Sequence, residues 1–180
     1  MSCSKRLSFT QNITNSKGGS SMERRHEVLF EQLNTYRGEL LEMVAGVSED
    51  ESEIIPRGFN NNIRWNLGHI FVDQYLWIRV LTKDEMPIPM KFIEWFGYGS
   101  SPSRFNDETP TFSQLIPMLQ QQPFTIQEKY QDRLEEEFAP TEMGIHTIEQ
   151  VLIRTIFHEG LHLSAIQAIK RQLDSKVGRN

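Results

Sequence analysis

The chain has 180 residues, of which 38% are hydrophobic and 24% are charged, as expected for one globular domain. A net charge of −5 without a basic run disfavours nucleic acid as a partner, and the lack of a long apolar stretch disfavours a membrane. The single cysteine, Cys3, excludes an intramolecular disulfide and fits a reducing compartment. We therefore expect a cytoplasmic protein.

Residues 1–21 differ in composition from the rest of the chain. They are rich in Ser and Asn, include Lys5, Arg6 and Lys17, and contain no acidic residue. This bias is also found in transit peptides, but the Gly-Gly-Ser-Ser run ahead of Met22 favours a flexible N-terminal extension. The sequence thus predicts one folded domain over residues 22–180.

Four segments have apolar residues at alternating steps of three and four, which is typical of amphipathic helices. The predicted helices run from Met22 to about Ala45, from about Asn62 to Thr82, from Thr111 to Glu137, and from Thr147 to Leu173. Asn60, Asn61 and Asn62 are candidate caps for the second helix. Pro117 and Pro123 should bend the third helix or delay its start.

The connections differ in length. Residues 46–58 predict a connection, and residues 83–110 predict a long one that carries an aromatic cluster, Phe92, Trp95, Phe96 and Tyr98. No segment shows the alternation of a strand. We therefore predict an all-α fold, an antiparallel four-helix bundle with a long connection between its second and third helices.

Three histidines are predicted to face the core. The inward stripe of the last helix has His158 and His162 at its centre and comprises Val151, Thr155, His158, His162, Ala165, Ile169 and Gln172. Two histidines four residues apart lie one turn apart and can reach one metal ion, with bonds of about 2.0–2.1 Å. His69 lies on the inner face of the second helix. The pattern predicts one divalent transition metal ion bound by these three residues.

A simpler interpretation remains open for these histidines. Buried imidazoles could form a polar layer that is hydrogen-bonded through Thr155, Asn66 or Asp73. The other two histidines, His26 and His146, lie near predicted helix starts, and we interpret them as solvated or capping residues.

Residues 158–162 also match the His-Glu-x-x-His pattern of zinc metalloproteases, in which the glutamate is the general base. The extended form of that pattern requires glycine at position 165 and histidine at position 168, where this chain has Ala165 and Ala168. No histidine or glutamate follows His162 to supply a third ligand. A protease is therefore disfavoured, and Glu159 is left as a candidate base or as support for a ligand.

Two segments resemble motifs of the DinB/YfiT-like superfamily of metal-binding four-helix bundles. Residues 62–70, with Trp65 four positions before His69, are similar to the motif around the first histidine of that family. Residues 158–162 are similar to its paired-histidine motif, and the likeness extends over residues 22–175. The resemblance implies that His69, His158 and His162 are the metal ligands and that the protein forms a homodimer.

The resemblance implies a range of functions. Members of the superfamily transfer or use low-molecular-weight thiols such as bacillithiol and mycothiol, others are assigned as metal-dependent hydrolases, and many have no known activity. Many members continue the second motif with Gly-Gln, whereas this chain has Ser164 and Ala165. This departure leaves the ligands intact and the subfamily open.

Three imidazole ligands leave a coordination position for water or substrate. We therefore expect a thiol S-transferase or a hydrolase acting on a small molecule; the alternative is a non-catalytic, stress-related metal-binding module. Zinc and nickel are the preferred ions, with iron and copper as alternatives. Asp73 is a candidate for orienting a ligand or for the base, and the candidate substrate contacts are Trp65, Arg64 and Arg154.

Overall fold

The computed structural model describes residues 22–177, and these residues form helices and loops without any strand. The all-α prediction is confirmed, whereas the predicted extension over residues 1–21 lies outside the described residues. No helix between residues 22 and 177 is both long and apolar enough to cross a membrane. The helices are α1 (Arg24–Val44), α2 (Glu49–Glu53), α3 (Ile63–Thr82), α4 (Lys91–Phe96), η1 (Pro102–Arg104), α5 (Phe112–Tyr130) and α6 (Ile148–Val177).

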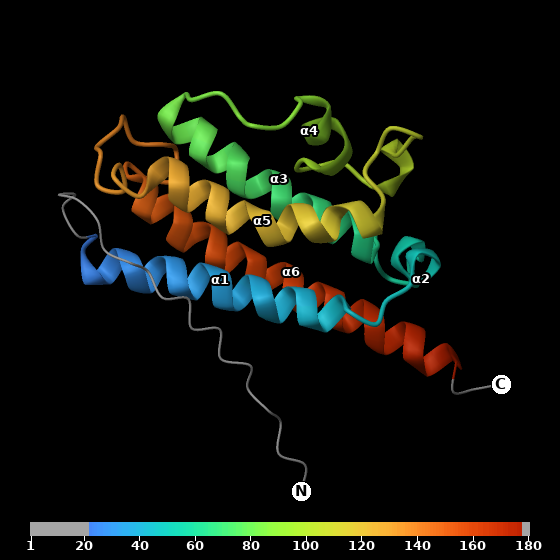
Figure 1. Ribbon diagram of the computed structural model, residues 1–180. Helices are drawn as coiled ribbons and strands as arrows, with labels where there is room; N and C mark the ends of the chain where they lie inside the picture. Colours follow the sequence, from blue (N-terminus) through green and yellow to red (C-terminus); the bar gives the residue numbers. More distant parts are fainter. Residues whose placement is uncertain (1–21, 178–180) are drawn as a thin grey trace, which may run out of the picture.

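Helices α1 and α6 lie side by side and run in the same direction (Figure 1). Near the start of both helices, Arg25 Nη1 lies 3.3 Å from a carboxylate oxygen of Glu149. Near the end of α1, the carbonyl of Met43 accepts a hydrogen bond from Lys170 of α6. The two helices are therefore parallel neighbours.

Helices α3 and α6 run in opposite directions. Asn66 near the start of α3 contacts His162, whereas Asp73, further along α3, contacts Arg154, which lies earlier in α6. Figure 1 shows α5 running in the same direction as α3, opposite to α1 and α6. The long helices within the described residues are thus two parallel pairs that oppose each other, which makes the long connection between α3 and α5 necessary.

The predicted helix starts agree with the structure. Asn62 caps α3, and Thr111 caps α5 in a capping box with Gln114. Pro117 and Pro123 lie inside α5, so they do not delay its start. The capping box supplies hydrogen-bond partners for the first backbone amides of α5, which stabilises the start of the helix ahead of the two prolines.

The predicted position of the end of the third helix is wrong. Helix α5 ends at Tyr130, before the predicted end at Glu137, yet Leu134 is buried in the turns that follow. The apolar pattern of the sequence therefore continues to Leu134 because this leucine is buried, although the helix has already ended. The two connections also contain short helices, α2 in the first and α4 in the second.

A buried charge cluster joins the four long helices. The guanidinium of Arg37 in α1 is 2% exposed and donates from Nε and Nη2 to the two carboxylate oxygens of Glu159 in α6, at 2.8 and 3.1 Å. It also donates to Leu119 O and Gln122 Oε1 of α5 and to Gln74 Oε1 of α3, at 2.7, 3.0 and 3.3 Å. All five guanidinium N–H groups thus have acceptors.

We expect the substitution Arg37→Met to lower the free energy of unfolding by about 3–5 kcal/mol, because it leaves the buried carboxylate of Glu159 without a counter-charge. Urea unfolding measures this loss. Arg24→Met is the matched control, since Arg24 is mostly exposed, and should change stability by less than about 0.5 kcal/mol. Adding Glu159→Met to Arg37→Met should recover part of the loss; equal stability of the two arginine variants would contradict the prediction.

Candidate metal centre

The structure brings together the three histidines that the sequence spacing selected. His69 extends from α3, and His158 and His162 extend from successive turns of α6. One ring nitrogen from each lies within 4.8 Å of the other two, a spacing that could hold a metal ion. His69 is buried, and the other two are partly exposed.

Hydrogen bonds determine which nitrogen of His69 and of His158 carries the proton. His69 Nδ1 lies 2.6 Å from the carbonyl oxygen of Phe96, and His158 Nδ1 lies 3.0 Å from a carboxylate oxygen of Asp73. Both oxygens can only accept hydrogen bonds, so each Nδ1 is the donor. In a neutral ring whose proton is on Nδ1, the Nε2 atom keeps its lone pair and can bind a metal ion.

His162 has the same arrangement. Its Nδ1 lies 2.7 Å from Asn66 Oδ1, and the orientation of that amide is fixed because Asn66 Nδ2 donates to the carbonyl of Asn62 at 2.7 Å. His162 Nδ1 is therefore a donor too, and its Nε2 lies 3.3 Å from His158 Nε2. Where both rings are neutral, two lone pairs face each other at this distance, which is unfavourable unless a cation lies between them. Asn66 and Asp73 thus bond the imidazoles as the polar-layer interpretation allows, and the ring nitrogens that remain fit a metal ion.

Burial keeps two of the rings neutral. It lowers the pKa of His69, and burial together with the charges of His69 and His158 lowers the pKa of His162 to about 3. Burial alone would raise the pKa of Asp73, but the hydrogen bond and charge of His158 and the charge of Arg154 lower it overall. Near pH 7, His69 and His162 are therefore neutral beside the ionised carboxylate of Asp73, and a neutral imidazole is the form that binds a metal ion.

A close approach of α4 to α3 supplies one of these hydrogen bonds. A Cβ atom at Gly68 would lie 2.2 Å from the ring of Phe96, so only glycine lets this phenylalanine pack here. The packing places the Phe96 carbonyl against His69. Trp65 adds a stacked contact with the His69 ring, with centroids 4.7 Å apart. Sequence periodicity does not predict this role of Phe96, because a backbone contact between distant segments leaves no periodic pattern.

Arg64 is not at the cluster, although it was a candidate for substrate binding. It pairs with Glu53, and its Nε and Nη2 atoms donate to the carbonyls of Pro110 and Thr109, each at 2.8 Å. These contacts join the start of α3 to α2 and to the residues before α5. The guanidinium thus has partners within the fold, and its role in substrate binding stays a prediction.

Arg154, a predicted substrate contact, lies beside the histidine cluster. It pairs with Asp73, and its guanidinium carbon lies 4.4 Å above the ring of Trp77. Beside it is a pocket of about 260 Å³, lined by His69, His158, Asp73 and Arg154 and by an apolar wall. The wall is formed by Val72, Leu76, Trp77 and Val80.

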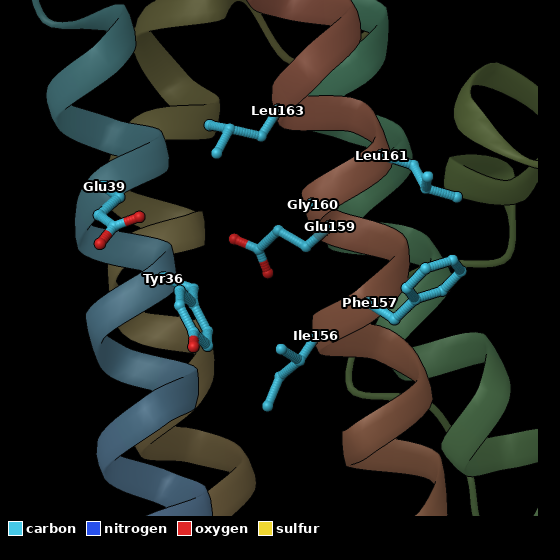
Figure 2. Close-up of a pocket in the computed structure, with 8 residues that line it drawn as sticks. All are labelled: Tyr36, Glu39, Ile156, Phe157, Glu159, Gly160, Leu161 and Leu163. Carbon is cyan, nitrogen blue, oxygen red and sulfur yellow. The ribbon is translucent and has the colours of Figure 1, made fainter.

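Glu159 lies on a different face of α6 from the histidines. Figure 2 shows its side chain extending toward α1, the helix that carries Tyr36, where both carboxylate oxygens accept from Arg37. Consecutive helical residues are about 100° apart, so Glu159 cannot share the direction of His158. The geometry does not support the predicted role of Glu159 as base or ligand support. Asp73 is the carboxylate beside the histidines.

The two remaining histidines differ from each other. His146 is partly exposed, and its Nδ1 lies 3.2 Å from the carbonyl of Gly144 near the start of α6. His26 is buried, so the prediction that it is solvated or capping is corrected. It lies near the start of α1, where that helix packs against α6 and the turns after α5.

Fold and site together define an all-helical protein with a three-histidine cluster that is compatible with metal binding. A sequence profile of the DinB superfamily matches residues 32–166, and the chain belongs to that superfamily. A comparison with the curated proteins finds no match. The matched range contains the three histidines, Asp73 and Arg37, so it covers both the cluster and the buried pair behind it.

We expect His158→Gln to lower the metal content of the purified protein by one equivalent, because one ligand of the three-histidine cluster is lost. Asp73→Asn keeps all three ligands but weakens the bond that orients His158, so affinity should fall by roughly 10–100-fold. Elemental analysis and competition with a chelating dye measure both effects. His146→Gln is the histidine control and should bind normally; equal metal content in His158→Gln and in the unsubstituted protein would refute the site.

Proposed function

We propose that this protein is a metal-dependent enzyme in which His69, His158 and His162 hold one divalent transition metal ion. Zinc and nickel are the preferred ions, and iron and copper are the alternatives. The observation that carries the proposal is that one ring nitrogen of each histidine lies within 4.8 Å of the other two, while each Nδ1 donates to an oxygen. A three-imidazole set leaves a coordination position open, as in catalytic sites.

When bound, such an ion would act as a Lewis acid toward a thiol or a water molecule. The role of the protein is to hold the rings ready. Asp73 keeps the proton of His158 on Nδ1, Asn66 does so for His162, and Phe96 does so for His69. Arg154 keeps Asp73 ionised and also lines the adjoining pocket. These contacts set the direction of each ring before any ligand arrives.

The pocket beside the cluster supports a small-molecule substrate. Its volume of about 260 Å³ suits a small molecule or part of one. Its apolar wall suits the carbon skeleton of an electrophile, and Arg154 suits an anionic group such as that of a low-molecular-weight thiol. The reaction we propose is therefore S-transfer from such a thiol, or hydrolysis of a small ester or amide.

Two wider proposals accompany this function. The helices α1, α3, α5 and α6 bury one apolar core between them, which supports describing the fold as a four-helix bundle. The low cysteine content supports a cytoplasmic location, and the negative net charge supports the absence of a nucleic-acid partner.

Assays with a bacillithiol-type thiol plus an electrophile, and with simple esters and amides, test the enzyme proposal. We expect turnover in one of them that is lost on chelation and restored by zinc or nickel. His162→Gln should abolish that turnover, whereas Glu136→Gln, a surface substitution, should leave it unchanged. Activity that survives both chelation and His162→Gln would refute a metal-dependent reaction.

One observation favours a non-catalytic alternative, a metal-binding stress-related module. The ligands come from two helices, so a bound ion would join α3 to α6. In that case chelation would lower the melting temperature strongly while no substrate is turned over. The enzyme proposal predicts both the thermal shift and metal-dependent turnover, so turnover decides between the two.

We also propose a homodimer. Ile153, Phe157 and Leu161 lie at steps of four along α6 and are 55%, 68% and 54% exposed. An exposed apolar row of this kind on one helix face is a common feature of protein interfaces. A second copy of the chain would cover it, with the two α6 helices side by side.

The oligomeric state of the protein in solution tests the proposed dimer interface. Phe157→Glu should convert a dimer into a monomer, because it places a charge in the proposed interface. Light scattering coupled to size exclusion measures the mass. Met143→Glu is the control, since Met143 is 63% exposed but lies outside α6. A monomeric mass for the unsubstituted protein would refute this interface.

A further inference from the structure

A second group of metal-ligand side chains lies where α1 and α6 begin. Glu23, His26 and Glu135 each offer a ligand atom, and these atoms lie within 4.8 Å of one another. They border a hollow of about 540 Å³ that is lined mainly by α1 and by the turns after α5. Glu149 of α6 adds a third carboxylate, 3.7 Å from the His26 ring.

The buried atom in this group is His26 Nε2. The side chain of His26 is 8% exposed, and its Nε2 makes no hydrogen bond. The nearest oxygens belong to Glu135 and Glu149, at 3.4 and 3.7 Å, and neither has hydrogen-bond geometry. A buried polar nitrogen without a partner is unfavourable. A metal ion bound between His26 and the carboxylates would give this nitrogen a partner.

We propose that Glu23, His26 and Glu135, with Glu149 as a further oxygen donor, form a second site for a divalent metal ion. One imidazole nitrogen with carboxylate oxygens is a ligand set that zinc accepts. Glu149 precedes His158 by nine positions on α6, or roughly 14 Å along the helix, so the two sites do not share ligands. This inference does not depend on the proposed enzyme function.

Arg25 competes with the proposed ion. Its guanidinium contacts Glu23 at 3.0 Å and Glu149 at 3.3 Å, and it also pairs with Glu135. The side chain is 52% exposed, so it can rotate into solvent when a metal ion takes its place. Removing this positive charge should therefore strengthen metal binding at the second site.

Titration of the full chain with zinc tests the site. The starting protein carries Cys3→Ser, because a thiolate also binds zinc, and His158→Gln with His162→Gln, which removes the first cluster. We expect one zinc equivalent to remain by calorimetry. His26→Gln and Glu135→Gln should each weaken it at least tenfold, and Arg25→Gln should tighten it several-fold. Glu128→Gln is the matched control and should bind as the starting protein does, since this exposed carboxylate of α5 does not line the hollow.

Two results would overturn the proposal: no zinc bound by the starting protein, or binding unchanged by Glu135→Gln. The first would mean that His26 only lies beside the carboxylates without sharing a metal ion with them. Glu135 is 51% exposed, so its substitution tests the site even if His26→Gln disturbs folding. Circular-dichroism melting identifies any variant that has unfolded.

Discussion

The buried guanidinium of Arg37 is the interaction on which the arrangement of the long helices depends. A charge removed from water is tolerated only when each of its donors meets an acceptor, and here the acceptors come from α3, α5 and α6. The bidentate pair with Glu159 constrains the geometry most strongly, because its two hydrogen bonds fix both the distance and the orientation of the two side chains. Helix α6 therefore cannot rotate about its axis without breaking this pair.

The charge cluster and the histidine cluster use neighbouring residues of the same two helices. Glu159 follows His158 in α6, and Gln74 follows Asp73 in α3. Gln74 accepts from Arg37 and donates to Thr155 of α6 at 3.2 Å. Thr155, one of the partners that the sequence allowed for the imidazoles, therefore bonds the charge cluster instead. It holds α3 and α6 at the rotation that lets Asp73 meet His158.

Sequence patterns predicted the features that depend on one helix at a time. The spacing of four between His158 and His162 and the capping position of Asn62 are local, and the structure has both as predicted. The features that sequence reasoning missed join segments far apart in the chain. The partner of Glu159 is 122 positions away, and the partner of His69 is a backbone carbonyl, which any residue could supply. Neither can produce a periodic pattern.

Helix α6 packs against two neighbours, and this explains why its inward stripe is wider than predicted. Three successive residues have three different surroundings: Phe157 is exposed, His158 faces α3, and Glu159 faces α1. Steps of about 100° allow this division only if the rotation of the helix is fixed to well within one step. The pair with Arg37 fixes it from the neighbouring face of the helix, which packs against α1. The geometry of the three imidazoles is thus a consequence of a charge pair that none of them touches.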